Sequence, residues 1–229
     1  MVYNLLSIIV PVYNEESTIA EVIQRINQTE LPLKKEIVVI DDGSNDQTTQ
    51  ILETEKDIAR LFSTPVNVGK GAAVRIGLTL YRGDIILIQD ADLELDPNEY
   101  NALLTPILTG ETQVVYGSRF LSKENKVPLL RVLANRSLTA FTNLLYRTKL
   151  TDMETAYKVF TAEVAQKLDL KANRFEIEPE ITAKIRNAGN KIVEVPISYK
   201  PRTKSEGKKI KWRDGIKAVW MLIKCFFNK

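Results

Sequence analysis

The chain has 229 residues, of which 44% are hydrophobic and 27% are charged, so it can bury a sizeable core and is not a disordered segment. Its formal net charge of +3 is small for a general nucleic-acid binder, so we expect no nucleic-acid partner. The absence of histidine and the single cysteine exclude histidine triads, histidine-ligated zinc, thiolate clusters and internal disulfides.

Strands and helices are expected to alternate through the first hundred residues. We expect buried strands at 5–12, 36–40, 59–63 and 84–88. Helices are expected at about 19–26, 47–56 and 69–78, and from Pro97 onward. This alternation predicts parallel βαβ units with helices on both faces of a sheet. The loops 13–15, 41–46 and 89–94 follow strand ends, so we expect them to converge on one crevice.

The second half of the chain has a less regular pattern. We expect strands at 113–117 and 191–199, and a further strand at 156–160 at the edge of the sheet. Helices are expected at 129–146, 178–188 and 212–227. No stretch reaches the roughly 18 apolar residues that cross a bilayer, and residues 1–12 lack the basic start of a signal peptide. These features predict a cytoplasmic or peripheral protein.

Three acids gather directly after the strand at 84–88. Asp90 and Asp92 alternate along an extended segment and so point to the same side, and Glu94 continues the pattern. Crowded carboxylates need a compensating cation, and Mg²⁺ or Mn²⁺ prefers oxygen ligands and often bridges a diphosphate. A solvated acidic turn capped by Asp96 is the alternative. The position after a core strand favours the metal site.

Two other loops carry residues suited to a nucleotide. We expect Asp42 to contact the nucleotide and Ser44 or Asp46 to hold the turn. Lys70 follows Gly69 at the start of a helix, where free backbone N–H groups attract anions. A tight turn with a solvated lysine is an equally good interpretation of that segment.

Five motifs appear in order along the chain: VPVYNE at 10–15, VIDDGS at 39–44, NVGKG at 67–71, DADLE at 90–94 and GSRF at 117–120. The ordered set resembles family 2 glycosyltransferases, and within them the dolichol-phosphate mannosyltransferase-like group. The resemblance continues to Trp212-x-Asp214-Gly215 and so covers nearly the whole chain.

The resemblance implies an α/β fold of the GT-A nucleotide-diphospho-sugar transferase type, with a mixed, mostly parallel central sheet flanked by helices. It implies a catalytic domain at 1–211, with a nucleotide-sugar half at about 1–120 and an acceptor half at about 121–211. Residues 212–229 would form a C-terminal amphipathic helix.

The resemblance also assigns roles to individual residues. The base and ribose would contact Pro11, Tyr13, Glu15, Ile40 and Asp42. The nucleotide-sugar and its metal ion would face Asp90, Ala91 and Asp92, with Asp92 and Glu94 as ligands, Asp90 nearby, and Lys70 on the phosphates. Relatives often carry glutamine at the position of Glu94. Arg119 would meet a donor or acceptor phosphate, Arg131 is a weaker candidate for the acceptor phosphate, and Arg202 and Lys208 would close over the diphosphate from a basic loop.

Asp152 has two possible roles. In relatives that act on hydroxyl acceptors, an acid in this region is the usual catalytic base. A phosphate acceptor is already ionised and needs no base, which would make Asp152 a turn residue. Both roles stay open at this point.

The function implied is an inverting, metal-dependent transfer of a hexose from a nucleotide-sugar of the GDP-mannose or UDP-glucose type to a polyprenyl phosphate. We expect it at the cytoplasmic surface of a membrane, with a possible homo-oligomer or separate membrane-anchored partner. The alternatives are a family 2 transferase with a lipid or small-molecule hydroxyl acceptor, and a non-catalytic nucleotide-sugar-binding module.

The last helix carries apolar residues on one face: Trp212, Ile216, Val219, Trp220, Ile223 and Phe227. We expect Trp212 and Ile216 to pack on the catalytic domain. The part from Trp220 to Phe227 is expected to face lipid headgroups, together with nearby lysines.

Overall fold

The central strand β1 (Leu5–Val12) is buried on both faces, which explains its continuous run of apolar residues. The computed structural model describes residues 3–122, 124–125, 127–202 and 212–228. Leu6, Ile8 and Val10 face one helical layer, whereas Ile9 faces the other. β1 pairs in parallel with β2 (Lys34–Asp41) and β4 (Ile85–Ile88).

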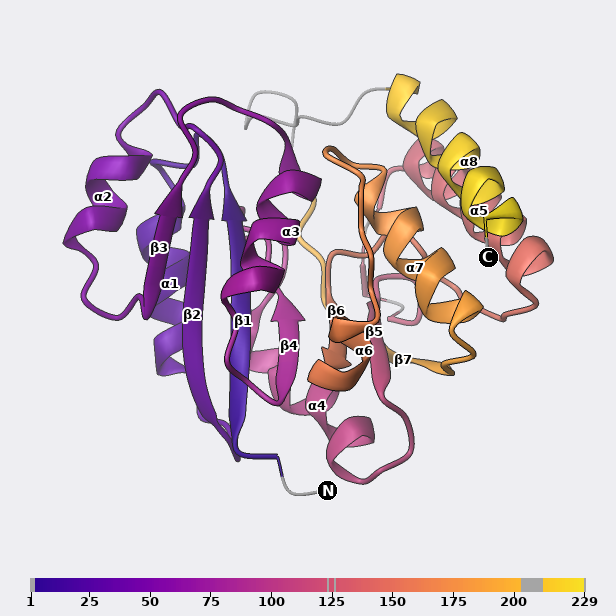
Figure 1. The fold of residues 1–229 in the computed structure, drawn as a ribbon, viewed down its shortest axis with the longest axis horizontal. Helices are drawn as coiled ribbons and strands as arrows, with labels where there is room; N and C mark the ends of the chain where they lie inside the picture. The colour runs from indigo at the N-terminus through magenta and orange to yellow at the C-terminus, as the bar shows by residue number, and fades with distance from the viewer. Residues whose placement is uncertain (1–2, 123, 126, 203–211, 229) are drawn as a thin grey trace.

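Seven strands form one sheet in the order β3-β2-β1-β4-β6-β5-β7 (Figure 1). The edge strands are β3 (Arg60–Ser63) and β7 (Ile192–Pro196), and β5 (Val114–Ser118) lies between β6 and β7. All strands run in parallel except β6 (Lys158–Thr161), which is antiparallel to β4 and β5. The predicted mixed, mostly parallel sheet is confirmed.

The prediction that the strand near 156–160 lies at the edge of the sheet is wrong. β6 lies between β4 and β5, and all four of its residues are buried. β6 contains a charged residue, Lys158, which is unusual for a strand inside a sheet. In the structure Lys158 is fully buried because its Nζ pairs with Glu178 Oε2 at 2.6 Å.

Helices cover both faces of the sheet (Figure 1). Those that pack on the face of Leu6 and Ile8 are α1 (Ile19–Gln28), α2 (Thr48–Thr54) and α4 (Tyr100–Leu108), which follows the 3₁₀ turn Pro97–Glu99. The other face carries α3 (Lys70–Leu80), α6 (Ala162–Gln166) and α7 (Ile177–Asn187). The short α6 was not expected. Beyond α7 lie α5 (Leu129–Tyr146) and α8 (Trp212–Phe227), which contact each other.

The strand directions bring distant segments to one edge of the sheet. The residues that follow β1, β2, β4, β5 and β7 lie at the carboxyl ends of parallel strands. Because β6 runs the other way, the segment 151–157 that precedes it lies at this same edge. Asn14 N donates to Ser44 Oγ at 2.9 Å, and Thr18 Oγ1 donates to Ala91 O at 2.8 Å. The predicted convergence of the first three loops is therefore confirmed.

The helix α8 packs through a narrow face of Ala218, Leu222 and Cys225. Tyr146 Oη donates to Leu222 O at 2.6 Å, which ties α8 to α5. The expectation that Ile216 packs on the domain is wrong, because this residue is 61% exposed. The small side chains of Ala218 and Cys225 allow the closest approach, so the larger ones point outward. The side chain of Trp212 lies outside the described part of the structure.

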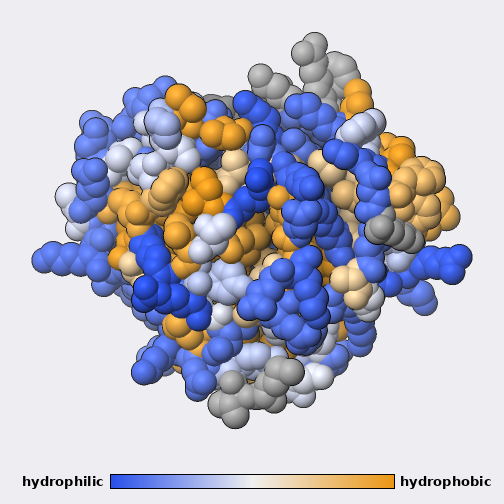
Figure 2. Space-filling view, in the orientation of Figure 1, coloured by the Kyte–Doolittle hydropathy of each residue, from blue (hydrophilic) through white to orange (hydrophobic). Residues whose placement is uncertain are grey.

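Four large apolar residues of α8 are exposed: Ile216 at 61%, Trp220 at 60%, Ile223 at 39% and Phe227 at 79%. On α5, the apolar residues Leu129, Leu130, Leu133 and Leu144 are exposed as well. Figure 2 shows hydrophobic surface along the right of the molecule, where Figure 1 places α8. We call these eight residues the apolar face. None of the described helices combines the length and hydropathy that crossing a bilayer requires.

Candidate active site at the carboxyl edge of the sheet

The acidic loop after β4 places three carboxylates within range of one another. Burial, together with the negative charges of Asp90 and Glu94, raises the pKa of Asp92 to about 7. The positive charge of Arg202 opposes this shift without cancelling it. Asp92 is therefore a carboxyl group that lacks enough positive charge around it. An added cation would relieve this repulsion.

The two neighbouring acids already have protein partners. Lys70 Nζ lies 2.6 Å from Asp90 Oδ1. Glu94 Oε1 accepts from Arg202 N at 2.7 Å, and Glu94 Oε2 accepts from the Tyr199 hydroxyl at 3.0 Å. The three acids thus share one loop. In the described part of the chain, however, no three acidic, cysteine or histidine side chains already lie close enough to hold a metal ion together. Their oxygens suit Mg²⁺ or Mn²⁺ once these contacts exchange.

Lys70 begins a buried chain of alternating charges. Its Nζ also lies 2.9 Å from Glu178 Oε1, and Glu178 Oε2 in turn accepts from Lys158 Nζ at 2.6 Å. The two carboxylates offset the cost of burial and raise the pKa of Lys70 above its usual value. The interpretation of Lys70 as a solvated lysine is therefore wrong. The anions it meets in this structure are the side chains of Asp90 and Glu178.

Arg202 joins two residues that were assigned to different parts of the nucleotide-sugar. Its NH2 lies 2.7 Å from Glu15 Oε2, its NH1 donates to Glu15 Oε1 at 3.2 Å, and its Nε donates to Asp92 O at 2.9 Å. The segment that carries Tyr199 and Arg202 therefore contacts the acidic loop at both Asp92 and Glu94. Lys208 lies outside the described residues.

The residues assigned to the base and ribose follow β1 and β2. Pro11 and Ile40 are buried partners in the two strands, and Tyr13 is partly exposed just beyond β1. Ala91 is buried in the acidic loop. All lie at the same edge of the sheet, although the geometry does not test their predicted contacts.

Asp42 holds the loop that leads into α3. Its Oδ1 accepts from Val68 N at 2.9 Å, and its Oδ2 accepts from Gly69 N at 2.7 Å and from Asn67 Nδ2 at 2.8 Å. Gly69 has φ 125°, and a Cβ there would lie 2.4 Å from Asn173 O. Asp42 thus has a structural role that the sequence did not indicate, and its contact with a nucleotide stays a prediction.

The turn residues beside Asp42 behave as expected. Asp46 Oδ1 accepts from Thr48 N at 2.9 Å at the start of α2, and Ser44 Oγ accepts from Asn14 N. Both side chains therefore hold the loops in place.

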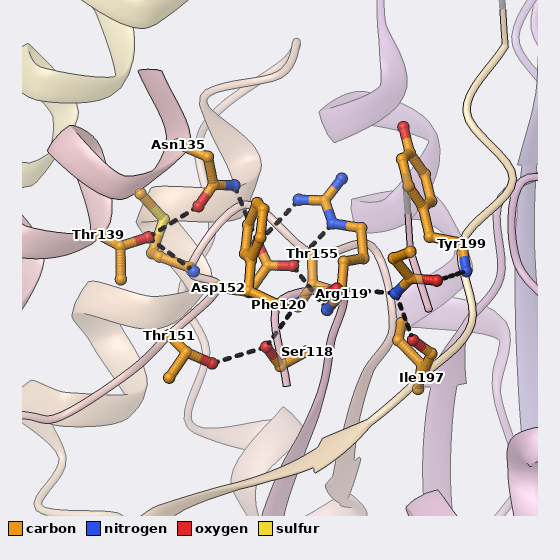
Figure 3. Close-up of polar contacts among 12 residues, drawn as sticks. Ser118, Arg119, Phe120, Asn135, Thr139, Thr151, Asp152, Thr155, Ile197 and Tyr199 are labelled. Carbon is orange, nitrogen blue, oxygen red and sulfur yellow. Dashed lines mark hydrogen bonds and ion pairs between the residues drawn. The ribbon is translucent and has the colours of Figure 1, made fainter. Parts of the chain in front are cut away.

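Arg119, which follows β5, pairs with Asp152, which precedes β6 (Figure 3). Asp152 is 0% exposed. Its Oδ2 accepts from Arg119 Nε at 2.7 Å and from Arg119 N at 3.1 Å. Its Oδ1 accepts from Arg119 NH2 at 2.8 Å and from Asn135 Nδ2 at 2.9 Å. Four N–H donors occupy the oxygens of Asp152, so a hydroxyl acceptor would have to displace one of them to reach this side chain, which disfavours the role of catalytic base.

Arg119 is fixed by this pair and by an aromatic ring. Burial disfavours its charge, but the carboxylate of Asp152 more than offsets that cost and raises the pKa of Arg119. Its guanidinium carbon lies 5.1 Å from the centroid of the Tyr199 ring. Arg131 NH2 donates to Arg202 O at 3.2 Å. The structure therefore gathers Arg119, Arg131 and Arg202 around Tyr199.

Glu194 on β7 holds the segment that carries Asp152. Its carboxylate accepts from Thr151 N at 2.7 Å and from Asp152 N at 2.9 Å. The structural roles of Glu194, Lys158 and Glu178 were not expected from the sequence. The signal common to all three is a charged residue within an otherwise apolar or buried segment.

Several known proteins resemble this chain in sequence or in fold. The family described as "Glycosyl transferase family 2" matches residues 7–169. The chain is 31% identical to an uncharacterized protein of Methanocaldococcus jannaschii, over 94% of this chain and 90% of that one. It is 30% identical to dolichyl-phosphate beta-glucosyltransferase ALG5A of Trichomonas vaginalis, over 96% of this chain and 72% of that one.

A further sequence relative and one solved structure also match this chain. The dolichol-phosphate mannosyltransferase of Pyrococcus furiosus is 29% identical over 88% of this chain, and the match spans 58% of that relative. Glucosyl-3-phosphoglycerate synthase of Mycobacterium tuberculosis, solved with Mg²⁺ and uridine diphosphate, has a TM-score of 0.77. It is 24% identical, and the match covers 98% of this chain and 80% of that one. This likeness confirms the expected fold.

Replacing Asp92 with asparagine should stabilise the protein at alkaline pH in the absence of metal. The pKa of Asp92 is raised to about 7, so its charged form is disfavoured in the fold, and this cost grows as the pH rises from about 4 to 7. In EDTA at pH 8 we expect the Tm of Asp92→Asn to exceed that of the wild type. The difference should be about 2–4 °C for each kcal/mol by which the substitution raises the free energy of unfolding. The control is Asp57→Asn on an exposed turn. An equal gain at pH 4 and pH 8 would contradict the explanation.

Replacing Asp152 with asparagine should destabilise the fold, because Arg119 would stay buried without its carboxylate. Breaking a buried ion pair from one side costs about 3–5 kcal/mol. The measurement is urea unfolding at pH 7. Asp169→Asn, which removes an exposed partner of Lys171, should leave the free energy of unfolding essentially unchanged. Equal effects of the two substitutions would show that the Arg119 pair does not hold the site.

Proposed function

The chain belongs to glycosyltransferase family 2 and is a glycosyltransferase, and from that premise we propose that it transfers a hexose from a nucleotide-sugar to a polyprenyl phosphate. The names of its relatives support this acceptor, since they include dolichyl-phosphate glucosyl- and mannosyltransferases. The sugar donor would be of the UDP-glucose or GDP-mannose type.

The observation that carries the proposal is the pairing of Arg119 with Asp152. A hydroxyl acceptor needs a group that takes its proton, and Asp152 already accepts four hydrogen bonds. Arg119 and Arg131 lie on the same side of the site and suit a phosphate instead. The site therefore offers arginines that can bind an anion, whereas Asp152 is already occupied by hydrogen bonds. This combination favours an acceptor that is already ionised when it binds.

The sugar-donor side offers oxygen ligands and cations for a diphosphate. Asp92 and Glu94 would hold Mg²⁺ or Mn²⁺, with Asp90 nearby, and the bound ion would neutralise charge on the leaving nucleoside diphosphate. Lys70 and Arg202 neutralise carboxylates in the present structure. If Asp90 turns toward a metal ion and Glu15 toward the ribose, the two cations would be free to contact phosphate oxygens.

The reaction proposed is an in-line displacement at the anomeric carbon with inversion. An oxygen of the acceptor phosphate attacks, and the bond to the nucleoside diphosphate breaks with its electron pair. No proton has to move, because the acceptor phosphate is largely a dianion at neutral pH. The protein positions the two charged substrates and screens the charge between them.

The proposed site of action is the cytoplasmic surface of a membrane, with the apolar face of α5 and α8 against the lipid. Arg131 lies on the same helix as Leu129, Leu130 and Leu133, so a phosphate bound by this arginine would have its hydrocarbon chain beside exposed leucines. Exposed Lys217 and Lys224 would contact anionic headgroups.

Transfer to a short polyprenyl phosphate should exceed transfer to the matching polyprenol by a large factor. We expect at least about 100-fold, because the alcohol brings no charge for the arginines and needs a base. The assay measures nucleoside diphosphate release from UDP-glucose and GDP-mannose with Mn²⁺ or Mg²⁺. Equal use of the polyprenol would favour the hydroxyl-acceptor alternative. Sugar-donor binding without turnover on any acceptor would favour the non-catalytic module.

Removing the apolar residues of α8 should weaken membrane binding. Trp220→Ser, Ile223→Ser and Phe227→Ser combined should reduce binding to phosphatidylcholine–phosphatidylglycerol vesicles by about 100-fold or more, since each buried apolar side chain contributes about 1.5–3 kcal/mol. Phe62→Ser on β3 is the matched control, because it removes an exposed aromatic residue far from α8. Vesicle flotation measures the binding. Unchanged flotation of the triple variant would exclude α8 as the contact.

A further inference from the structure

Tyr199, which follows β7, has a side chain that makes two different contacts. Its hydroxyl donates to Glu94 Oε2 at 3.0 Å, and its ring centroid lies 5.1 Å from the guanidinium carbon of Arg119. Figure 3 shows the ring beside the Arg119 side chain. Glu94 belongs to the proposed metal site, and Arg119 is proposed to meet the acceptor phosphate. One side chain therefore contacts residues from both halves of the site.

The backbone holds Tyr199 in this position from two directions. Tyr199 N donates to Asn125 Oδ1 at 2.8 Å, and Asn125 Nδ2 donates to Arg119 O at 2.7 Å. On the other side, Lys200 N donates to Glu94 O at 3.0 Å. Hydrogen bonds thus tie the backbone around Tyr199 to the same two segments that its side chain contacts. The position of the ring is therefore set by both segments together.

The hydrogen bond from Tyr199 is compatible with a metal ion on Glu94. Each carboxylate oxygen has two lone pairs, so Glu94 Oε2 can accept from the Tyr199 hydroxyl and still offer an electron pair to Mg²⁺ or Mn²⁺. Donors of this kind fix the orientation of a metal ligand, and their loss typically weakens metal binding by about 10- to 100-fold. The ring acts separately, because its π electrons attract the charge of Arg119 and so hold the guanidinium in place.

We propose that Tyr199 is a positioning residue for both substrates: its hydroxyl orients Glu94 toward the metal ion, and its ring orients Arg119 toward the acceptor phosphate. The role of the ring rests on the proposed function, in which the acceptor is a polyprenyl phosphate. An in-line displacement requires the leaving diphosphate and the attacking phosphate to be held at a suitable distance from each other. Tyr199 fixes the residues that hold each of them relative to one another.

Tyr199→Phe tests the hydroxyl alone, because the ring stays in place. The measurement is calorimetric binding of UDP and of GDP, at a fixed Mn²⁺ concentration and again in EDTA. With Mn²⁺, the affinity of the variant for the nucleotide that the wild type binds should fall by about 10- to 100-fold. In EDTA the two proteins should bind that nucleotide equally, because the hydroxyl acts through the metal ligand. Damage to the fold would weaken binding in EDTA as well.

Tyr199→Leu removes the ring together with the hydroxyl. The acceptor KM for a short polyprenyl phosphate is measured with Mn²⁺ and sugar donor raised until each variant is saturated. This KM should rise by about 3- to 30-fold in Tyr199→Leu and stay within about twofold of the wild type in Tyr199→Phe. The control is Tyr146→Phe, which also loses a hydroxyl hydrogen bond, to Leu222 O on α8. It should behave as the wild type in both measurements.

Each half of the proposal has a result that would overturn it. If Tyr199→Phe binds the nucleotide with Mn²⁺ as tightly as the wild type does, the hydroxyl does not orient Glu94. If Tyr199→Phe and Tyr199→Leu raise the acceptor KM equally, the ring does not position Arg119. A wild type that transfers nothing to polyprenyl phosphate would contradict the proposed function and the role of the ring with it. The role of the hydroxyl is decided by nucleotide binding, which needs no acceptor.

Discussion

Charge removed from water must be neutralised inside the protein, and this constraint organises the whole carboxyl edge of the sheet. One chain of contacts runs from Asp90 through Lys70 and Glu178 to Lys158, linking β4, α3, α7 and β6. Each member has a partner of opposite sign, so removal of one would leave a neighbour buried and uncompensated. The loops of the site are therefore held by mutual pairing as well as by the strands they follow.

The antiparallel strand β6 makes this pairing possible. Its direction brings the segment before it to the edge where the other strands end, so Asp152 meets Arg119 and Lys158 meets Glu178. Arg202 joins Asp92 of the acidic loop to Glu15, which lies 187 residues away in the chain.

Most elements could be predicted from the sequence because their apolar patterns are strong and local. β1 and α5 begin and end where the pattern indicated. The position of β6 within the sheet could not be predicted, since strand pairing is non-local and Lys158 has no local sign of its buried partner. In the candidate site, the ordered motifs pointed to Asp92 and Arg119, and the resemblance pointed to Asp152. The partners that fix them, such as Asn135 and Glu194, become visible only when the fold brings them together.

The outward side chains of α8 also affect how the isolated protein behaves in solution. A net charge of +3 on 229 residues provides little electrostatic repulsion between molecules. The exposed Trp220 and Phe227 of α8, together with the exposed leucines of α5, are apolar surface through which neighbouring molecules can associate. The isolated protein should therefore aggregate more readily without lipid or detergent than with either of them covering these two helices. Its solubility during purification depends on that cover as well as on the stability of the fold.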